Sequence, residues 1–370
     1  MPSAKKIIIE LFATADVKID GERNWDIKVN NEKFYSRVMR EGSLGMGESY
    51  MDGWWECDQL DECINKVLRA DLPSKVRKSI KLLPWYLGQR VLNPQTRSRA
   101  RKVGEQHYDV GNELYQAMLG ERMVYTCAYW KNSSNLNEAQ EAKLDLVCRK
   151  LKLERGMTVL DIGCGWGSFL KFAAEKYGIN GLGVTISKEQ TKLARENVDG
   201  LPIEIKRQDY RDVTGQFDRV LSLGMFEHVG LKNYRTYMKV TRDRLAENGL
   251  ALLHTIGGNN NRSVDPWLAR YIFPNSMLPS VEQISKAMQG LFVLEDWDNF
   301  GTDYDPTLLS WYANFESACP QLKEKYDDRF YRMWKYYLLS VAGASRSRTM
   351  QLWQVVMSKH GLLGGYESVR

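Results

Sequence analysis

The chain has 370 residues, of which 43% are hydrophobic and 26% charged, and its formal net charge is +6. Length and composition indicate a soluble globular protein with one large domain and an appendage, or with two domains. No stretch reaches the roughly 18 to 20 apolar residues of a membrane span, and we expect no secretory signal. Six cysteines without a CxxC pair fit a reducing cytosol, and four histidines without ligand spacing argue against a metal site.

Residues 1–80 predict a small, mainly helical N-terminal domain. Their apolar residues recur at helical spacing and are interrupted by the glycines of "GSLGMG". A basic linker is expected over 81–104, and four basic residues each occur in 75–83 and 96–102. A solvated face is the simpler interpretation of these runs, and a patch for nucleic acid or anionic lipid head groups is the alternative.

From residue 105 to 370, short apolar runs alternate with helical patterns. This alternation predicts a parallel sheet with both faces covered, and a late strand at the sheet edge. The fold class is therefore α/β, with seven strands in a doubly wound, nucleotide-binding arrangement. The expected strands lie at 158–163, 178–187, 201–210, 217–224, 249–258, 291–301 and 350–359.

A glycine-rich loop, "VLDIGCGWGSFL", follows the first of these strands and precedes a helix. Gly163, Gly165 and Gly167 allow a tight turn and a close approach of the backbone to a ligand. Their G-x-G-x-G spacing differs from the dinucleotide fingerprint, which disfavours a nucleotide-dependent dehydrogenase. The pattern resembles motif I of S-adenosylmethionine-dependent methyltransferases, whose fold is a seven-stranded, Rossmann-like sheet.

The next two strands end differently from many enzymes of that kind. The second strand ends in "VTIS" without an acidic residue for the ribose, so Thr185 and Gln190 are the candidate partners. The third strand ends in "QDY", where Asp209 could accept a hydrogen bond from an adenine amino group and Tyr210 could stack. Asp209 could equally serve as a helix N-cap, and the two roles are compatible.

Longer motifs in the same order resemble those of the bacterial cyclopropane-fatty-acyl-phospholipid synthases over nearly the whole chain. The motifs are "GSLGMGESYMDGWW", "HYDVGNELY", "VYTCAYW", "GMFEHVG", "HTIGG", "VDPWLARYIFPN", "DNFGTDYDPTLLSWYANF" and "QLWQVV". The resemblance implies transfer of a methylene from S-adenosylmethionine to the cis double bond of a phospholipid acyl chain. It also implies a carbocation that a bound bicarbonate ion deprotonates.

Carried over residue by residue, the family's bicarbonate cradle falls on five positions. They are Cys127, Glu227, His254, the backbone of Ile256, and Tyr304. Without the resemblance, we would interpret Cys127 as a small buried hydrophobic residue and His254 as a hydrogen-bonded histidine of the core. Glu227 follows the fourth strand, where doubly wound folds place ligands, and it either holds the bicarbonate and the histidine or is itself the base. Tyr304 either orients the anion or stabilises the cation through its ring.

The family's cofactor contacts fall on nine positions of this chain. They are Tyr125, Thr126, Gly163, Gly165, Thr185, Ile186, Gln190, Asp209 and Tyr210. Thr126 is commonly serine in the family, and the hydroxyl is retained.

The resemblance further implies a cytoplasmic homodimer that docks on the anionic phospholipid surface at the inner face of the membrane, with no nucleic-acid partner. The N-terminal domain would then provide lipid docking or dimer contacts. Two other enzyme activities are a fatty-acid methyltransferase that leaves a branched chain and an N-methyltransferase of a small amine. Glu227, His254 and Tyr304 together favour ring closure, because amine methylation needs no base for a carbocation. A non-catalytic lipid-surface protein is disfavoured by the intact cofactor motifs.

Overall fold

The computed structural model describes residues 3–72, 111–261, 264–322 and 324–370, which fall into two compact units. The first unit takes in 1–114, 264–275 and 308–349, as far as these are described, and the second takes in the remainder. The expectation of one catalytic domain over 105–370 differs from this grouping, because two later segments pack with the N-terminal helices. The expected linker and both basic runs lie outside the described residues.

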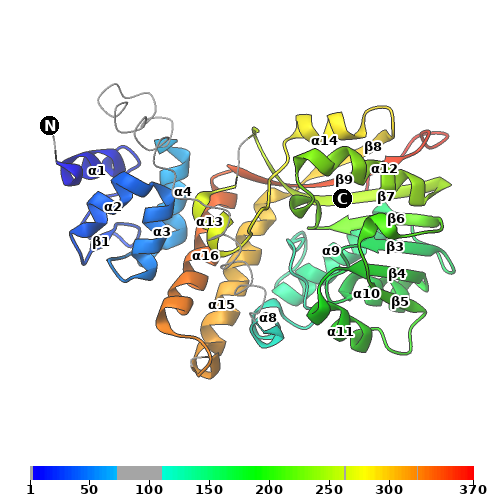
Figure 1. Ribbon diagram of the computed structural model, residues 1–370, viewed down its shortest axis with the longest axis horizontal. Coiled ribbons are helices and arrows are strands. Elements are labelled where there is room, and N and C mark those ends of the chain that lie inside the picture. The colour runs from blue at the N-terminus through cyan, green and yellow to red at the C-terminus, as the bar shows by residue number, and fades with distance from the viewer. Residues whose placement is uncertain (1–2, 73–110, 262–263, 323) are drawn as a thin grey trace. The chain divides into compact units, whose positions relative to one another are not determined.

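The first unit is mainly helical, as the sequence predicts (Figure 1). Its elements are α1 (Ala4–Ala13), β1 (Lys28–Val29), α2 (Lys33–Glu41), α3 (Ser43–Met51), β2 (Trp55–Glu56), α4 (Leu60–Arg69), α13 (Pro266–Tyr271) and α16 (Asp328–Arg346). Two helices, α8 (Asn112–Leu119) and α15 (Tyr304–Leu322), contribute residues to both units. None of the described helices is both long and apolar enough to cross a bilayer.

The glycines of "GSLGMG" have two different roles. Gly42 has φ +60° and separates α2 from α3, as expected of a glycine break. Gly47 instead lies inside α3, where a Cβ would come within 2.4 Å of the Trp267 indole. The close approach of α13 to α3 therefore requires glycine at this position, and the helix continues through it.

The second unit contains one seven-stranded sheet and the helices that cover it. Its strands are β3 (Thr158–Ile162), β4 (Asn180–Thr185), β5 (Ile203–Arg207), β6 (Phe217–Leu223), β7 (Leu245–Gly258), β8 (Val293–Asn299) and β9 (Met350–Ser358). Its helices are α9 (Leu136–Lys150), α10 (Ser168–Tyr177), α11 (Lys188–Asn197), α12 (Tyr234–Arg244) and α14 (Val281–Met288). The one-turn helices are η1 (Tyr210–Asp212), η2 (Phe226–His228), η3 (Leu231–Asn233) and η4 (Gly301–Asp303).

The strand order is β5-β4-β3-β6-β7-β9-β8, which confirms the predicted doubly wound α/β sheet. The five strands from β5 to β7 are parallel, whereas β9 runs antiparallel to both of its neighbours. The late strand at the edge is β8, and the last strand of the chain is inserted between β7 and β8. As a result, β7 has a parallel neighbour on one side and an antiparallel neighbour on the other.

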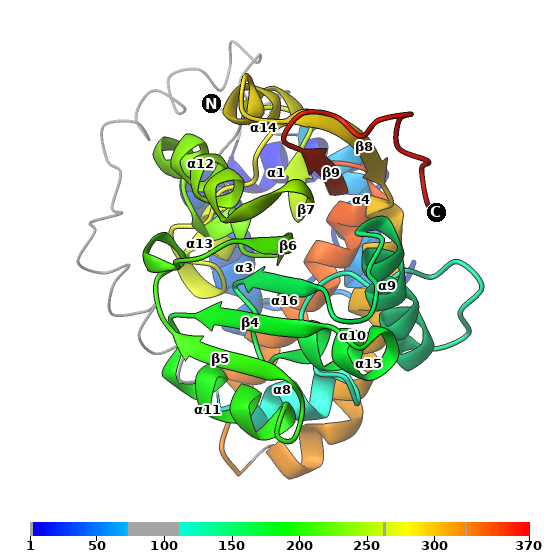
Figure 2. The ribbon, with the colours of Figure 1, turned by 90° about the vertical axis from the view of Figure 1, so that its right-hand side faces the viewer.

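Alternate residues of the strands enter two separate cores, one on each face of the sheet. In β7, Leu250 and Leu252 pack with α9, α10 and α11, whereas Ala251 and Leu253 pack with α12 and α14. Figure 2 shows the two groups of helices against the strands. With both faces covered, the carboxyl ends of the parallel strands are the place where such a sheet accepts a ligand.

We predict that Gly47→Ala destabilises the first unit although alanine favours a helix by about 1 kcal/mol over glycine. The added methyl must displace the buried Trp267 ring, and overpacking of this kind costs about 1 to 3 kcal/mol. Urea unfolding followed by tryptophan fluorescence measures the loss. Gly111→Ala is the control, since a Cβ there meets nothing within 4 Å. An unchanged midpoint for Gly47→Ala would contradict the packing argument.

Candidate functional site

The glycine loop after β3 makes a tight turn and leaves open space at its middle. Gly163 has φ +85° and its N–H donates to the carbonyl of Val184 at 2.9 Å. A Cβ on Gly163 would lie 2.7 Å from the side chain of Met225. Gly165 has φ +56°, and a Cβ there would meet nothing within 4 Å. The loop therefore has the backbone conformation and the free volume that a ligand lying against it needs.

The end of β4 brings two of the expected cofactor residues into contact. The hydroxyl of Thr185 donates to the side-chain oxygen of Gln190 at 2.9 Å. Ile186, between them in the chain, is 75% exposed. Gln190 lies on the first turn of α11, and its amide N–H₂ still has donor capacity beside the bond that its oxygen accepts. An uncharged pair thus stands at the end of β4, where the sequence has no acidic residue.

The end of β5 gives Asp209 the capping role that the sequence left open. Its carboxylate accepts from the backbone N–H of Arg211 at 2.9 Å and pairs with that residue's guanidinium. The hydrogen bonds from the guanidinium, more than the one from the backbone, lower the pKa of Asp209. The ring of Tyr210 packs at 5.7 Å from that of Tyr237. The capping role leaves the adenine contact of Asp209 a prediction.

A buried lysine adjoins the segment "VYTCAYW", and the sequence did not reveal it. Lys143, on α9, is fully buried and its Nζ donates to the hydroxyl of Thr126 at 2.8 Å. Asp161, at the end of β3, is also buried, and its charge acts on Lys143. Burial lowers the pKa of Lys143 to about 7 and raises that of Asp161 to about 7. Nearby, Tyr125 packs edge-on against Tyr115.

A sequence signal for this lysine exists in α9. Lys143 and Lys150 follow Leu136 at intervals of seven residues, which places all three on the same side of the helix. All three are buried. A lysine at an apolar heptad position therefore marks a paired or functional cation, whereas lysines elsewhere on such a helix are normally solvated.

Cys127 is buried, and the backbone that follows it is held by hydrogen bonds to the region where α15 begins. The N–H of Ala128 donates to the Thr307 hydroxyl at 3.2 Å, and that of Trp130 donates to the Asp303 carboxylate at 2.8 Å. The thiol itself donates to the carbonyl of Ala128 at 3.2 Å. Burial, and then the negative charge of Asp303, raise the pKa of Cys127 well above its usual range. The thiol therefore stays protonated, which does not suit a nucleophile.

Glu227, in η2 after β6, reaches across to the end of β7. Its Oε1 accepts from the backbone N–H of Ile256 at 2.7 Å. Its Oε2 is buried and has no hydrogen-bond partner among the described residues. Burial raises the pKa of Glu227 to about 7, against the opposing effect of the Ile256 N–H. The structure thus joins two of the five residues expected in the cradle.

His254 lies two residues before Ile256 on β7 and faces β9. Its Nδ1 is 3.2 Å from the side-chain nitrogen of Gln354, and its Nε2 has no partner among the described residues. The imidazole is edge-on to Phe300 at 6.0 Å between ring centroids. Burial, and then the positive charges of Lys143 and Lys150, lower the pKa of His254 well below its usual range. The imidazole is therefore neutral.

The expected site residues collect at one edge of the sheet. Most of them lie at or just after the carboxyl ends of parallel strands, namely β3, β4, β5, β6 and β7. These ends meet at the same edge of the sheet. Tyr304 is buried at the start of α15, one residue after Asp303, whose charge acts on Cys127. Lys143 acts on both Cys127 and His254, which places these groups within electrostatic reach of it.

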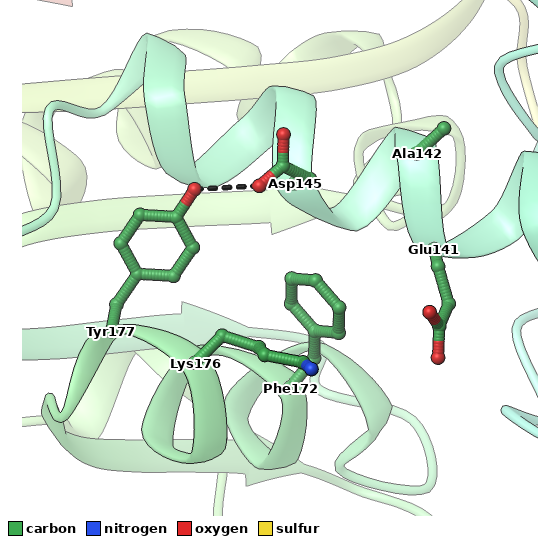
Figure 3. A pocket seen from close by; sticks show the side chains of 6 residues that line it. All are labelled: Glu141, Ala142, Asp145, Phe172, Lys176 and Tyr177. Atoms are coloured by element: carbon green, nitrogen blue, oxygen red, sulfur yellow. Dashed lines mark hydrogen bonds between the residues drawn. The ribbon is translucent and has the colours of Figure 1, made fainter. Parts of the chain in front are cut away.

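One hollow of the second unit is lined by none of these residues (Figure 3). It is an open depression between α9 and α10, and its side chains are those of Glu141, Ala142, Asp145, Phe172, Lys176 and Tyr177. The Tyr177 hydroxyl donates to Asp145 at 2.6 Å across it. None of the expected site residues lines this depression, so we do not assign the cofactor to it.

Comparison with known families decides the class of protein. A family model described as mycolic acid cyclopropane synthetase matches residues 95–355. The chain belongs to this family. Its resemblance to cyclopropane synthases is thereby confirmed, and so is its assignment as an S-adenosylmethionine-dependent methyltransferase.

One relative of the cyclopropane synthetase family matches nearly end to end. The cyclopropane-fatty-acyl-phospholipid synthase of Escherichia coli strain K12 is 52% identical over 96% of this chain and 93% of its own length. The cyclopropane synthase MmaA2 of Mycobacterium tuberculosis has a similar structure, with a TM-score of 0.65 and 26% identity over 72% of this chain and all of its own. The mycolic acid cyclopropane synthase CmaA1, solved with SAH and CTAB, is also similar. Its TM-score is 0.64, and it is 28% identical over 70% of this chain and 98% of its own.

We predict that the stability of the second unit depends on the proton of Glu227. Burial raises the pKa of its carboxyl from 4.5 to about 7, so the folded state binds the proton more tightly than the unfolded state. This contribution is complete below pH 4.5 and is lost as the pH rises to about 7. The free energy of unfolding, measured with urea, should therefore fall for the wild type relative to Glu227→Gln as the pH rises over that interval. The exposed Glu154→Gln is the control, and parallel curves for Glu227→Gln would refute the assignment.

Proposed function

We propose that the chain is a cyclopropane-fatty-acyl-phospholipid synthase. It transfers a methylene from S-adenosylmethionine to the cis double bond of unsaturated acyl chains of membrane phospholipids, through a carbocation that bound bicarbonate deprotonates. The observation that carries this proposal is the 52% identity to the Escherichia coli enzyme over 96% of the chain. The buried, unpartnered polar atoms at the carboxyl edge of β6 and β7 support it.

The cofactor fits the edge built by β3, β4 and β5. Gly165 offers open space beside the backbone, Thr126 offers a hydroxyl, and the Thr185–Gln190 pair offers an amide. S-adenosylmethionine supplies the electrophilic methyl group, and its sulfur keeps the electron pair of the broken carbon–sulfur bond. We assign Tyr125, Thr126, Gly163, Gly165, Thr185, Ile186, Gln190, Asp209 and Tyr210 to its binding.

An anion fits the edge built by β6 and β7. Nε2 of His254 and Oε2 of Glu227 are buried and have no hydrogen-bond partner among the described residues, although buried polar atoms normally have one. Because Glu227 is easily protonated, it can donate a hydrogen bond to a bicarbonate oxygen instead of repelling it. Bicarbonate supplies the base that takes the proton of the transferred methyl before the ring closes. Cys127, Glu227, His254, Ile256 and Tyr304 form the proposed cradle.

The surroundings of this edge exclude water, which would otherwise quench a carbocation. Phe300 is buried, and its ring packs against those of His254 and Tyr129. The ring of Tyr304 is buried as well. Aromatic faces also stabilise a desolvated cation by about 2 kcal/mol or more.

We further propose that the protein is cytoplasmic and docks as a homodimer on the anionic phospholipid surface at the inner face of the membrane. A soluble enzyme has to draw the acyl chain out of the bilayer, and two docking surfaces raise avidity. The N-terminal helices and the basic runs between them and residue 105 are the segments that we assign to this contact.

The activity is tested directly on lipid vesicles. The pure protein is incubated with S-adenosylmethionine and vesicles of cis-unsaturated or saturated phospholipid, and the released fatty acids are analysed by mass spectrometry. We predict a gain of one CH₂ with loss of the double bond, on the unsaturated chain only. A gain of CH₂ with the alkene retained would instead indicate a methyl-branching enzyme, and no gain despite bound cofactor would refute lipid methylation.

The cradle is tested by two substitutions, each assayed beside the wild type at a low and at a saturating concentration of bicarbonate. We predict that Glu227→Gln lowers kcat by roughly 10²-fold or more, the range of acid–base groups. Cys127→Ser should lower kcat about tenfold, because one hydrogen bond of about 1.4 kcal/mol corresponds to that factor. Added bicarbonate should restore part of the lost rate. The exposed Glu154→Gln is the control for Glu227→Gln. Full activity of Glu227→Gln would exclude the proposed cradle.

A further inference from the structure

The side chains of His254 and Gln354 are paired directly across two strands. In the antiparallel register of β7 and β9, His254 lies opposite Gln354. Opposite residues of this kind place their side chains on the same face of the sheet, within contact distance. His254 is 1% exposed and Gln354 is fully buried. The side-chain nitrogen of Gln354 lies 3.2 Å from Nδ1 of the imidazole.

The orientation of the Gln354 amide decides which ring nitrogen of His254 carries the proton. With the amide nitrogen toward the ring, the amide donates, so Nδ1 accepts and is unprotonated, and the amide oxygen of Gln354 stays buried without a partner among the described residues. A neutral imidazole with a bare Nδ1 carries its single proton on Nε2. That Nε2 is buried and unpartnered among the described residues, so an N–H at this position requires an acceptor.

The other donors expected in the cradle are partly engaged already. The N–H of Ile256 donates to Oε1 of Glu227, and the thiol of Cys127 donates to the carbonyl of Ala128. The Nε2–H of His254 is therefore a donor that an incoming anion can use without breaking either bond.

We propose that Gln354 is a positioning residue that holds His254 in the Nε2–H tautomer, so that the imidazole donates a hydrogen bond to the anion bound at this edge. The identity of the anion as bicarbonate and the choice of amide orientation both rest on the proposed function, whereas the tautomer itself can be measured without turnover. If the amide were reversed, its oxygen would accept from Nδ1–H, and the bare Nε2 would turn its lone pair toward the anion. The donating orientation is the one that suits an anion site.

Histidine-selective ¹⁵N labelling of the full chain tests the tautomer directly, because the protein has only four histidines. His254→Gln assigns the signal. We expect Nδ1 of His254 to have the chemical shift of an unprotonated nitrogen and Nε2 that of a protonated one. Gln354→Glu, which can only accept, should move the proton to Nδ1 or protonate both nitrogens. Gln354→Met, which neither donates nor accepts, should give a mixture of tautomers.

Gln351→Met is the matched control. Gln351 is also a buried glutamine of β9, but it lies opposite Gly257 and bonds to Asn299. This substitution should leave the His254 signals unchanged. In vesicle assays with added bicarbonate, Gln354→Met should raise the KM for bicarbonate about tenfold, as expected for one weakened hydrogen bond to a charged group, while the Kd for S-adenosylhomocysteine stays constant.

A wild-type spectrum of the Nδ1–H tautomer would overturn the proposal. So would an Nε2–H tautomer that persists unchanged in both Gln354→Glu and Gln354→Met, since Gln354 would then not determine it. Equal effects of Gln354→Met on the KM for bicarbonate and on S-adenosylhomocysteine binding would point to a structural role instead. Absence of any cyclopropane product would refute the proposed function separately, because the tautomer is read without turnover.

Discussion

The register of β7 against its two neighbours is the constraint on which the site depends. Pairing with β6 sets Leu223 opposite His254, and this brings the turn that carries Glu227 to the N–H of Ile256. Pairing with β9 sets Gln354 opposite the same histidine. A slip of one residue would turn every side chain of β7 to the other face and separate all of these groups. The two apolar cores, which take alternate residues of β7, fix that register.

Burial gives the polar groups at this edge their chemical character. A carboxyl, an imidazole and a thiol are all removed from water, and each is pushed toward its neutral form. The carboxyl and the imidazole each keep one buried atom without a partner among the described residues, and these two atoms can form hydrogen bonds to a small anion. Lys143 is the exception, because it brings a positive charge among these groups at the price of its own desolvation. Its hydrogen bond to Thr126 connects the residues that we propose for the anion with those that we propose for the cofactor.

The sequence predicted the sheet well because the strands are short apolar runs bounded by glycine, and such runs depend little on distant contacts. It placed Gly163 and Gly165 in a turn, and offered a cap as one of two roles for Asp209, for equally local reasons. It did not predict that β9 would be inserted between β7 and β8, since strand order depends on packing between segments about a hundred residues apart. Gln354 was part of a recognised motif, yet its role follows only from that insertion.

Buried lysines are missed for a different reason. A lysine in a helix is normally solvated, so residue type alone predicts an exposed Lys143, and only its seven-residue spacing from the buried Leu136 indicates otherwise. Its burial is explained by Thr126 and Asp161, neither of which is adjacent in the chain. The same holds for Lys150, whose partner Asp298 lies on β8. The spacing within α9 can indicate that such a lysine is buried, but its partners are identified only when the fold brings them together.

The central claim is that one edge of the sheet holds both the cofactor and an anion that acts as the base. A crystal structure of the protein grown with S-adenosylhomocysteine and bicarbonate tests it most directly. The account predicts the cofactor product along the loop at Gly163 and Gly165, and a planar anion in hydrogen-bond contact with Nε2 of His254 and the carboxyl of Glu227. A cofactor product at that loop with the space between His254 and Glu227 closed or filled by water alone would contradict it.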